Sequence, residues 1–309
     1  MLGRRSWHSF RVICFLFVAV ATSHSAGPTP LQIATSGPPV SRLTLRAVRS
    51  SPLDLELGGE LAGLPAGTVR YLTREDLLRL PKVSYTVIDD ANFSGPVQIR
   101  GVELEVLAHE FAGAGEKALV VAVCDDFYRA HYPREYVRAH RPVLVLEIDG
   151  HAPAGWPKSK EGSGSAMGPY LISHPHFTSS FKILSHEDEA QIPWGVVRLE
   201  FRTEEAVFGE IAPRGSHANE PAVQAGYRIA QQNCLRCHGP DSYSRLKGQY
   251  TWSGIALLAA YSPESFAAYV RNPKSVAQSA EMPGNPKYDE ATMQALISYF
   301  RTFSAKEKP

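Results

Sequence analysis

Residues 221–239 read PAVQAGYRIAQQNCLRCHG. The helical first part leads into Cys234-Leu235-Arg236-Cys237-His238, which is the C-x-x-C-H arrangement of covalent haem attachment. Two thiols three positions apart at the end of a helix can both reach the vinyl groups along one porphyrin edge, and the next residue then lies under the iron. The motif predicts one covalent haem c per chain, attached at Cys234 and Cys237, with His238 as the proximal iron ligand.

A second iron ligand is expected from the turn-rich segment 281–286, which reads EMPGNP. Proline rigidifies the backbone there, so the loop can present the Met282 side chain to a ligand. The thioether of methionine is a soft donor that suits haem iron and raises its potential. Met293 falls on the apolar face of the last helical segment and is assigned to the core, and Met167 belongs to the other domain. His217 is the alternative, but it sits in a linker, so we expect Met282 to be the distal ligand.

The C-x-x-C spacing also occurs in zinc sites and in thiol redox sites. Zinc would need two further cysteine or histidine ligands nearby, and neither residue type follows His238 in the chain. The sequence therefore favours haem over zinc.

The region 219–305 resembles the class I cytochrome c family. Besides the haem motif, the matching positions are Gly226, Tyr227, Gly239, Met282, Pro283, Leu296 and Tyr299. The resemblance implies an all-α domain whose first and last helices cross where the glycine lets the two backbones approach. It also implies a six-coordinate iron that transfers electrons.

The N-terminus has the layout of a signal peptide. Arg4 and Arg5 precede an apolar run over 12–21 and then a small, polar segment over 22–26. The run is about half of the ~20 residues that a membrane-spanning helix needs, so cleavage after Ser23 or Ala26 is favoured over an uncleaved anchor. We expect a periplasmic or otherwise exported protein that is soluble after cleavage.

Length and composition predict a multidomain soluble protein. The chain has 309 residues, 44% of them hydrophobic and 20% charged, with a formal net charge of +1, which does not suggest disorder or nucleic-acid binding. The expected parts are a signal peptide (1–26), an extended arm (27–67), an α+β domain (68–211), a linker (212–218) and the all-α haem domain (219–305). In the α+β domain we predict strands over 83–88, 118–123, 143–148 and 195–201 and helices over 73–80 and 102–111.

The α+β domain is loosely similar to the molybdopterin-binding domain of the sulfite oxidase family. The matching segments are Gly101-Val102-Glu103-Leu104, Ala112-Gly113, the strand Val120-Val121-Ala122-Val123 with Cys124-Asp125-Asp126, the strand 143–148 and Gly168-Pro169-Tyr170. The family's molybdenum-ligating cysteine lies upstream of the first segment, but residues 52–100 contain no cysteine. We therefore read Cys124 as a buried strand cysteine and expect the domain to keep the fold without molybdopterin. The pair His174 and His176 is read as structural and not as a metal site.

These features favour single-electron transfer, with the α+β domain docking a redox protein or a respiratory chain component. A membrane-associated partner and an enzymatic role both stay open at this stage. The main alternative is a molybdenum-cofactor oxidoreductase with a fused cytochrome c as electron acceptor. A haem-based sensor is a third hypothesis and would require Met282 to leave the iron.

Overall fold

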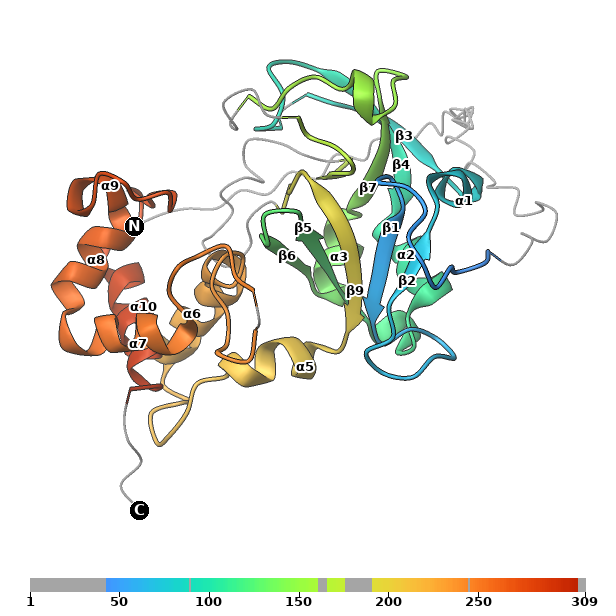
Figure 1. Cartoon of the computed structure of the whole chain (residues 1–309). Coiled ribbons are helices and arrows are strands. Elements are labelled where there is room, and N and C mark those ends of the chain that lie inside the picture. The colour runs from blue at the N-terminus through green and yellow to red at the C-terminus, as the bar shows by residue number, and fades with distance from the viewer. Residues whose placement is uncertain (1–42, 89, 161–165, 176–190, 244, 305–309) are drawn as a thin grey trace, which may run out of the picture. The chain divides into compact units, whose positions relative to one another are not determined.

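The computed structural model describes residues 43–88, 90–160, 166–175, 191–243 and 245–304 (Figure 1). The expected signal peptide, the first part of the expected arm and His176 lie outside these residues. The elements of the described part are β1 (Leu55–Gly59), β2 (Arg70–Leu72), α1 (Arg74–Arg79), β3 (Val83–Val87), β4 (Val97–Glu103), α2 (Leu104–Phe111), η1 (Gly115–Lys117), β5 (Leu119–Cys124), β6 (Arg129–Tyr132), α3 (Arg134–His140), β7 (Val143–Ile148), η2 (Pro153–Gly155), β8 (Ile172–Ser173), β9 (Val196–Arg202), α5 (Glu204–Phe208), η3 (Gly209–Ile211), α6 (Pro221–Ile229), η4 (Ala230–Cys234), α7 (Trp252–Tyr261), α8 (Pro263–Arg271), α9 (Pro273–Val276) and α10 (Glu290–Arg301). Strands and helices are mixed, as expected for an α+β protein. None of the helices in these ranges is both long enough and apolar enough to cross a bilayer.

The first sheet has five strands in the order β2-β1-β9-β5-β6. Strands β1 and β9 are parallel, and the other neighbours are antiparallel. Strand β1 lies inside the segment expected as an extended arm, so the folded core begins earlier than predicted. Its side chains alternate in the way a strand requires: Leu55 and Leu57 are fully buried, while Glu56 between them pairs with Arg198 at 3.1 Å.

The second sheet is antiparallel, in the order β3-β4-β7-β8. The helix expected over 102–111 begins only at Leu104, because Val102 and Glu103 still pair with β7 as the end of β4. Strands β3, β5, β7 and β9 lie within one residue of their predicted bounds. Thr73 is the N-cap of α1, since its hydroxyl accepts a hydrogen bond from the backbone N–H of Asp76 at 3.1 Å.

Strand β5 separates two apolar cores because successive side chains of a strand point to opposite faces. One core joins both sheets and helix α2, and it contains Val120, Ala122 and Cys124 of this strand. The other core contains Leu119, Val121 and Val123 and continues into helices α5, α6, α7 and α10. Apolar packing therefore runs past the expected linker at 212–218 without a break.

From Pro221 onward the described elements are helices (Figure 1). Helices α6 and α10 cross at Gly226, where an added Cβ would overlap the carbonyl oxygen of Ala295 and lie 2.7 Å from the Cβ of Tyr299. The Tyr227 and Tyr299 rings stack there with centroids 5.6 Å apart. The structure thus brings together the helix positions predicted to cross.

Candidate functional site

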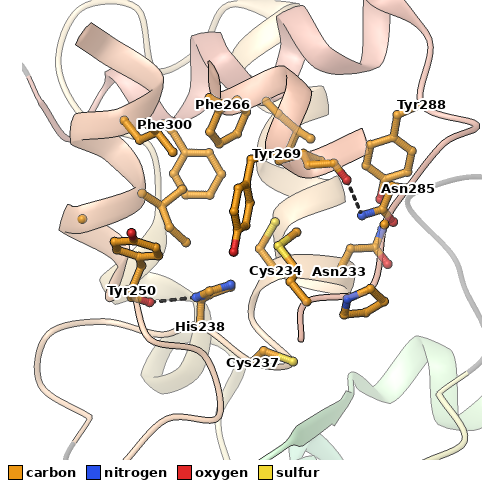
Figure 2. Close-up of a pocket in the computed structure, with 18 of the residues that line it drawn as sticks. Asn233, Cys234, Cys237, His238, Tyr250, Phe266, Tyr269, Asn285, Tyr288 and Phe300 are labelled. Atoms are coloured by element: carbon orange, nitrogen blue, oxygen red, sulfur yellow. Dashed lines mark hydrogen bonds between the residues drawn. The ribbon is translucent and has the colours of Figure 1, made fainter. Parts of the chain in front are cut away.

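A cavity of about 650 Å³ lies among the helices of the C-terminal part (Figure 2). Its lining includes all four residues expected to hold the haem, namely Cys234, Cys237, His238 and Met282. Figure 2 shows Phe266 and Phe300 at one end, Cys237 with His238 toward the other, and the Tyr269 ring between them. One apolar cavity therefore carries two thiols, an imidazole and a thioether.

The attachment motif follows an irregular end of helix α6. The π-helical turn η4 is marked by the Leu235 N–H, which donates to the carbonyl of Ala230, five residues earlier, at 3.0 Å. A tight turn comes next, in which the N–H groups of Cys237 and His238 both donate to the Cys234 carbonyl, at 3.2 and 2.9 Å. Single π-helical turns are frequent at functional sites, and this one ends at the first cysteine of the motif.

The orientation of His238 is set by a backbone carbonyl. Its Nδ1 lies 2.7 Å from the carbonyl oxygen of Tyr250 (Figure 2). A carbonyl oxygen can only accept, so Nδ1 must carry the proton and Nε2 keeps its lone pair. Burial lowers the pKa of His238 and so favours the neutral ring. The hydrogen bond to the Tyr250 carbonyl acts in the opposite direction and raises the pKa, but its effect is smaller. Gly248 makes room for the imidazole, because an added Cβ there would overlap the ring.

Cys234 and Cys237 are free and partly buried. Burial raises the pKa of Cys234 to about 12 and also raises the pKa of Cys237. Thiol redox sites have the opposite environment, one that lowers the pKa of the attacking cysteine. The two thiols therefore lack the activation of a redox C-x-x-C pair.

In the part of the chain that the structure describes, no group of three or more His, Cys, Asp and Glu side chains is placed to hold a metal ion.

The loop that carries Met282 is tied to the end of helix α8. Asn285 donates to the Val270 carbonyl through its backbone N–H at 3.0 Å and through its side chain at 3.3 Å (Figure 2). Arg271 donates from Nε to the Tyr288 carbonyl at 3.0 Å. These bonds fix the loop on the C-terminal side of Pro283 and Gly284, and Met282 lines the cavity just before them.

Tyr250, Gly248 and Tyr128 are among the residues of the site that were not predicted. The Tyr250 carbonyl has no sequence signature, because every residue carries one. Gly248 could have been suspected as a glycine in the loop that follows the motif. Tyr128 also lines the cavity, although it belongs to the α+β part of the sequence, and no local pattern could have placed it there.

Cys124 lies in the first core and is 3% exposed, so the prediction of a buried strand cysteine is confirmed. Burial raises the pKa of its thiol well above the usual value, and the nearby carboxylates of Asp126 and Asp125 act in the same direction. A molybdenum centre of the sulfite oxidase type needs a thiolate ligand. Cys124 does not fit that role.

No protein-family profile matches the chain. The chain is 27% identical over 143 residues to cytochrome c oxidase subunit 2 of Alkalihalophilus pseudofirmus, and the match covers 44% of this chain and 38% of that subunit. The chain thus spans less than half the length of this relative. The crystal structure of the sulfane dehydrogenase SoxCD from Paracoccus pantotrophus is similar at 17% sequence identity and a TM-score of 0.33, over 51% of this chain and 40% of that one. A TM-score of this size does not establish a shared fold.

Proposed function

We propose that this chain is a c-type cytochrome that carries single electrons through one covalently attached haem, with 219–305 forming a class I cytochrome c domain. One observation carries the proposal. In a cavity shared with two thiols and a thioether, the proton on Nδ1 of His238 is held by the Tyr250 carbonyl, so that Nε2 is left with a free lone pair. An imidazole in this tautomer is the form that binds a metal.

Each lining residue has a definite task in this proposal. The Cys234 and Cys237 thiols would each add across a vinyl group of the porphyrin, sulfur to one carbon and hydrogen to the other, with no net oxidation. His238 and Met282 would hold the iron. The haem would supply an iron that changes between the ferric and ferrous states, which is the chemistry of single-electron transfer.

The sequence comparison supports a redox role. The matched relative is named as a subunit of a cytochrome c oxidase. We therefore propose a redox protein or a respiratory chain component as partner. The signal-peptide layout of residues 1–26 supports a location outside the cytoplasmic membrane.

A molybdenum enzyme with a fused cytochrome is the second candidate. It needs a thiolate in the α+β part, and Cys124 is a buried, protonated thiol in the core. The electron carrier is the better supported function for this reason.

The test is elemental analysis for iron and molybdenum, with a pyridine haemochrome assay, on protein exported by a host that makes both cofactors. We expect about one iron per chain in haem that survives acid extraction, and no molybdenum. Cys234→Ala with Cys237→Ala should abolish covalent haem, whereas the control Cys124→Ala should retain it. Haem content unaffected by the double variant would contradict the attachment sites, and molybdenum near one per chain would favour the enzyme.

The same preparation tests Met282. The reduced wild-type protein should bind carbon monoxide poorly, and Met282→Ala should bind it readily because one position on the iron becomes open. Met293→Leu is the matched control, since Met293 is fully buried in the core and leucine conserves its volume. Ready binding by the wild type would remove Met282 as a ligand and favour a sensor.

A further inference from the structure

One wall of the cavity is formed by the α+β part. Tyr128 lines the cavity and lies at the end of the turn 125–128, which joins β5 to β6. The turn is well defined: the Cys124 N–H donates to the Tyr128 carbonyl at 2.9 Å, and the Tyr128 N–H donates to the Asp126 carboxylate at 3.0 Å. Phe127 has a φ of +68°, which turns the chain between them.

The residue that follows the turn, Arg129, is hydrogen-bonded to the C-x-x-C-H motif. The backbone N–H of Arg129 donates to the carbonyl of Arg236, the residue just before Cys237, at 2.8 Å. The Arg129 guanidinium also donates to the carbonyl of Arg245 at 2.9 Å. Tyr128, next to Arg129 in the chain, therefore lies on the wall beside the attachment motif.

A second set of contacts holds the turn from the loop that follows His238. The Lys247 ammonium lies 5.4 Å from the centre of the Tyr128 ring and forms an ion pair with Asp126. The Arg245 guanidinium lies 4.9 Å from the centre of the Phe127 ring. Cations over aromatic faces are favourable contacts, so charge and packing both hold the turn and this loop together.

Resting on the proposed function, we infer that the turn 125–128 is part of the haem site. The Tyr128 ring closes the cavity wall beside Cys237 and keeps water from that edge of the haem. The α+β part thus acts on the haem directly and is not only a docking module.

Exclusion of water has a definite electrostatic consequence. The ferric form of a haem carries one more positive charge than the ferrous form, so a dry, low-dielectric wall disfavours the ferric form and raises the reduction potential. If the wall is opened, water stabilises the ferric form and the potential falls.

The test is spectroelectrochemical titration of the exported holoprotein. Tyr128→Ala should lower the equilibrium constant for reduction several-fold, where a tenfold change corresponds to 59 mV for one electron. Tyr128→Phe keeps the ring and should titrate like the wild type. Tyr261→Ala is the matched control, because Tyr261 is 81% exposed and is not part of the cavity wall. Equal potentials for Tyr128→Ala and the wild type would overturn the inference.

A second measurement does not depend on how the Tyr128 variants fold. Hydrogen exchange of the amides of 125–129 should be slower in the wild-type holoprotein than in the haem-free chain with Cys234→Ser and Cys237→Ser. If these amides exchanged as fast in a haem-loaded wild type as in the haem-free chain, the inference would be overturned and the cytochrome proposal would stand. A wild type without haem would overturn both.

Discussion

Two histidines of the α+β part, His131 and His174, are buried. His131 is 2% exposed, and neither of its ring nitrogens has a hydrogen-bond partner within the described residues. His174 is 1% exposed, and its Nε2 lies 3.1 Å from the hydroxyl of Tyr136. Burial lowers the pKa of both rings to about 3. Both rings are therefore neutral in the folded protein near pH 7.

This burial predicts a sensitivity to acid. The unfolded chain has histidine pKa values near 6.5, so between about pH 3 and 6.5 it binds more protons than the folded protein. The free energy of unfolding should therefore fall as the pH decreases through this window, with a slope that approaches about 1.4 kcal/mol per pH unit for each histidine. Denaturant unfolding at a series of pH values measures the slope.

His131→Leu should flatten that slope and cost little at pH 7, because the imidazole nitrogens have no partner to lose and the ring packs near Phe208 on an apolar face. His109→Gln is the control, since 75% of the His109 side chain is exposed, and it should leave the slope unchanged. A slope that His131→Leu does not change would show that this ring titrates alike in both states.

At the residue scale, the sequence was informative where spacing imposes chemistry. Cys234, Cys237 and His238 follow from a five-residue motif, and Met282 follows from the turn chemistry around it. Tyr128 could not be predicted, because its place in the cavity depends on a hydrogen bond between Arg129 and Arg236, which are far apart in the chain.

At the scale of elements, the crossing of α6 and α10 depends on one glycine. A methyl group at Gly226 would overlap the Ala295 carbonyl and force the two helices apart. We expect Gly226→Ala to destabilise the protein by about 2 to 3 kcal/mol or more, although alanine is the better helix former. Chemical denaturation followed by circular dichroism measures the loss.

Gly254→Ala is the matched control within helix α7. An added Cβ there would lie 3.5 Å from the nearest atom, a Tyr250 ring carbon, which is ordinary van der Waals contact. This change should be neutral or should stabilise the protein by up to about 1 kcal/mol through helix propensity. Equal effects of the two substitutions would contradict the close crossing.

Elements with a clear period were predictable, and elements without one were not. Strand β7 has its predicted bounds because proline, arginine, aspartate and glycine flank an apolar run that only Glu147 interrupts. Helix α7 has apolar residues around most of its circumference, so no helical stripe marked it. Strand β1 was hidden between Pro52 and the glycine pair at its end, and its pairing with both β2 and β9 makes it a strand.

At the scale of the whole described chain, one apolar core includes a face of β5 and the helices around the cavity. Val121 of β5 belongs to the same cluster as Val223 of α6 and Leu296 of α10. Two polar bonds reinforce this core: the hydroxyl of Tyr227 donates to the Phe208 carbonyl at 3.0 Å, and that of Tyr299 donates to the Ile211 carbonyl at 2.5 Å. A core shared in this way couples the folding of its parts.

We therefore expect the sheet and the helices around the cavity to unfold in one cooperative transition, detected alike by far-ultraviolet circular dichroism and by the absorbance of the proposed haem. Val121→Ala removes two methyl groups from the shared core and should lower the free energy of unfolding by about 1 to 3 kcal/mol. The denaturation midpoint should fall equally by both probes. Val48→Ala, at a side chain that is 75% exposed, should change neither midpoint. If the two probes gave different midpoints, or if Val121→Ala changed only the midpoint seen by circular dichroism, the core would not couple the two parts. Coincident shifts would mean that a substitution on β5 affects the helices around the cavity through the core that they share.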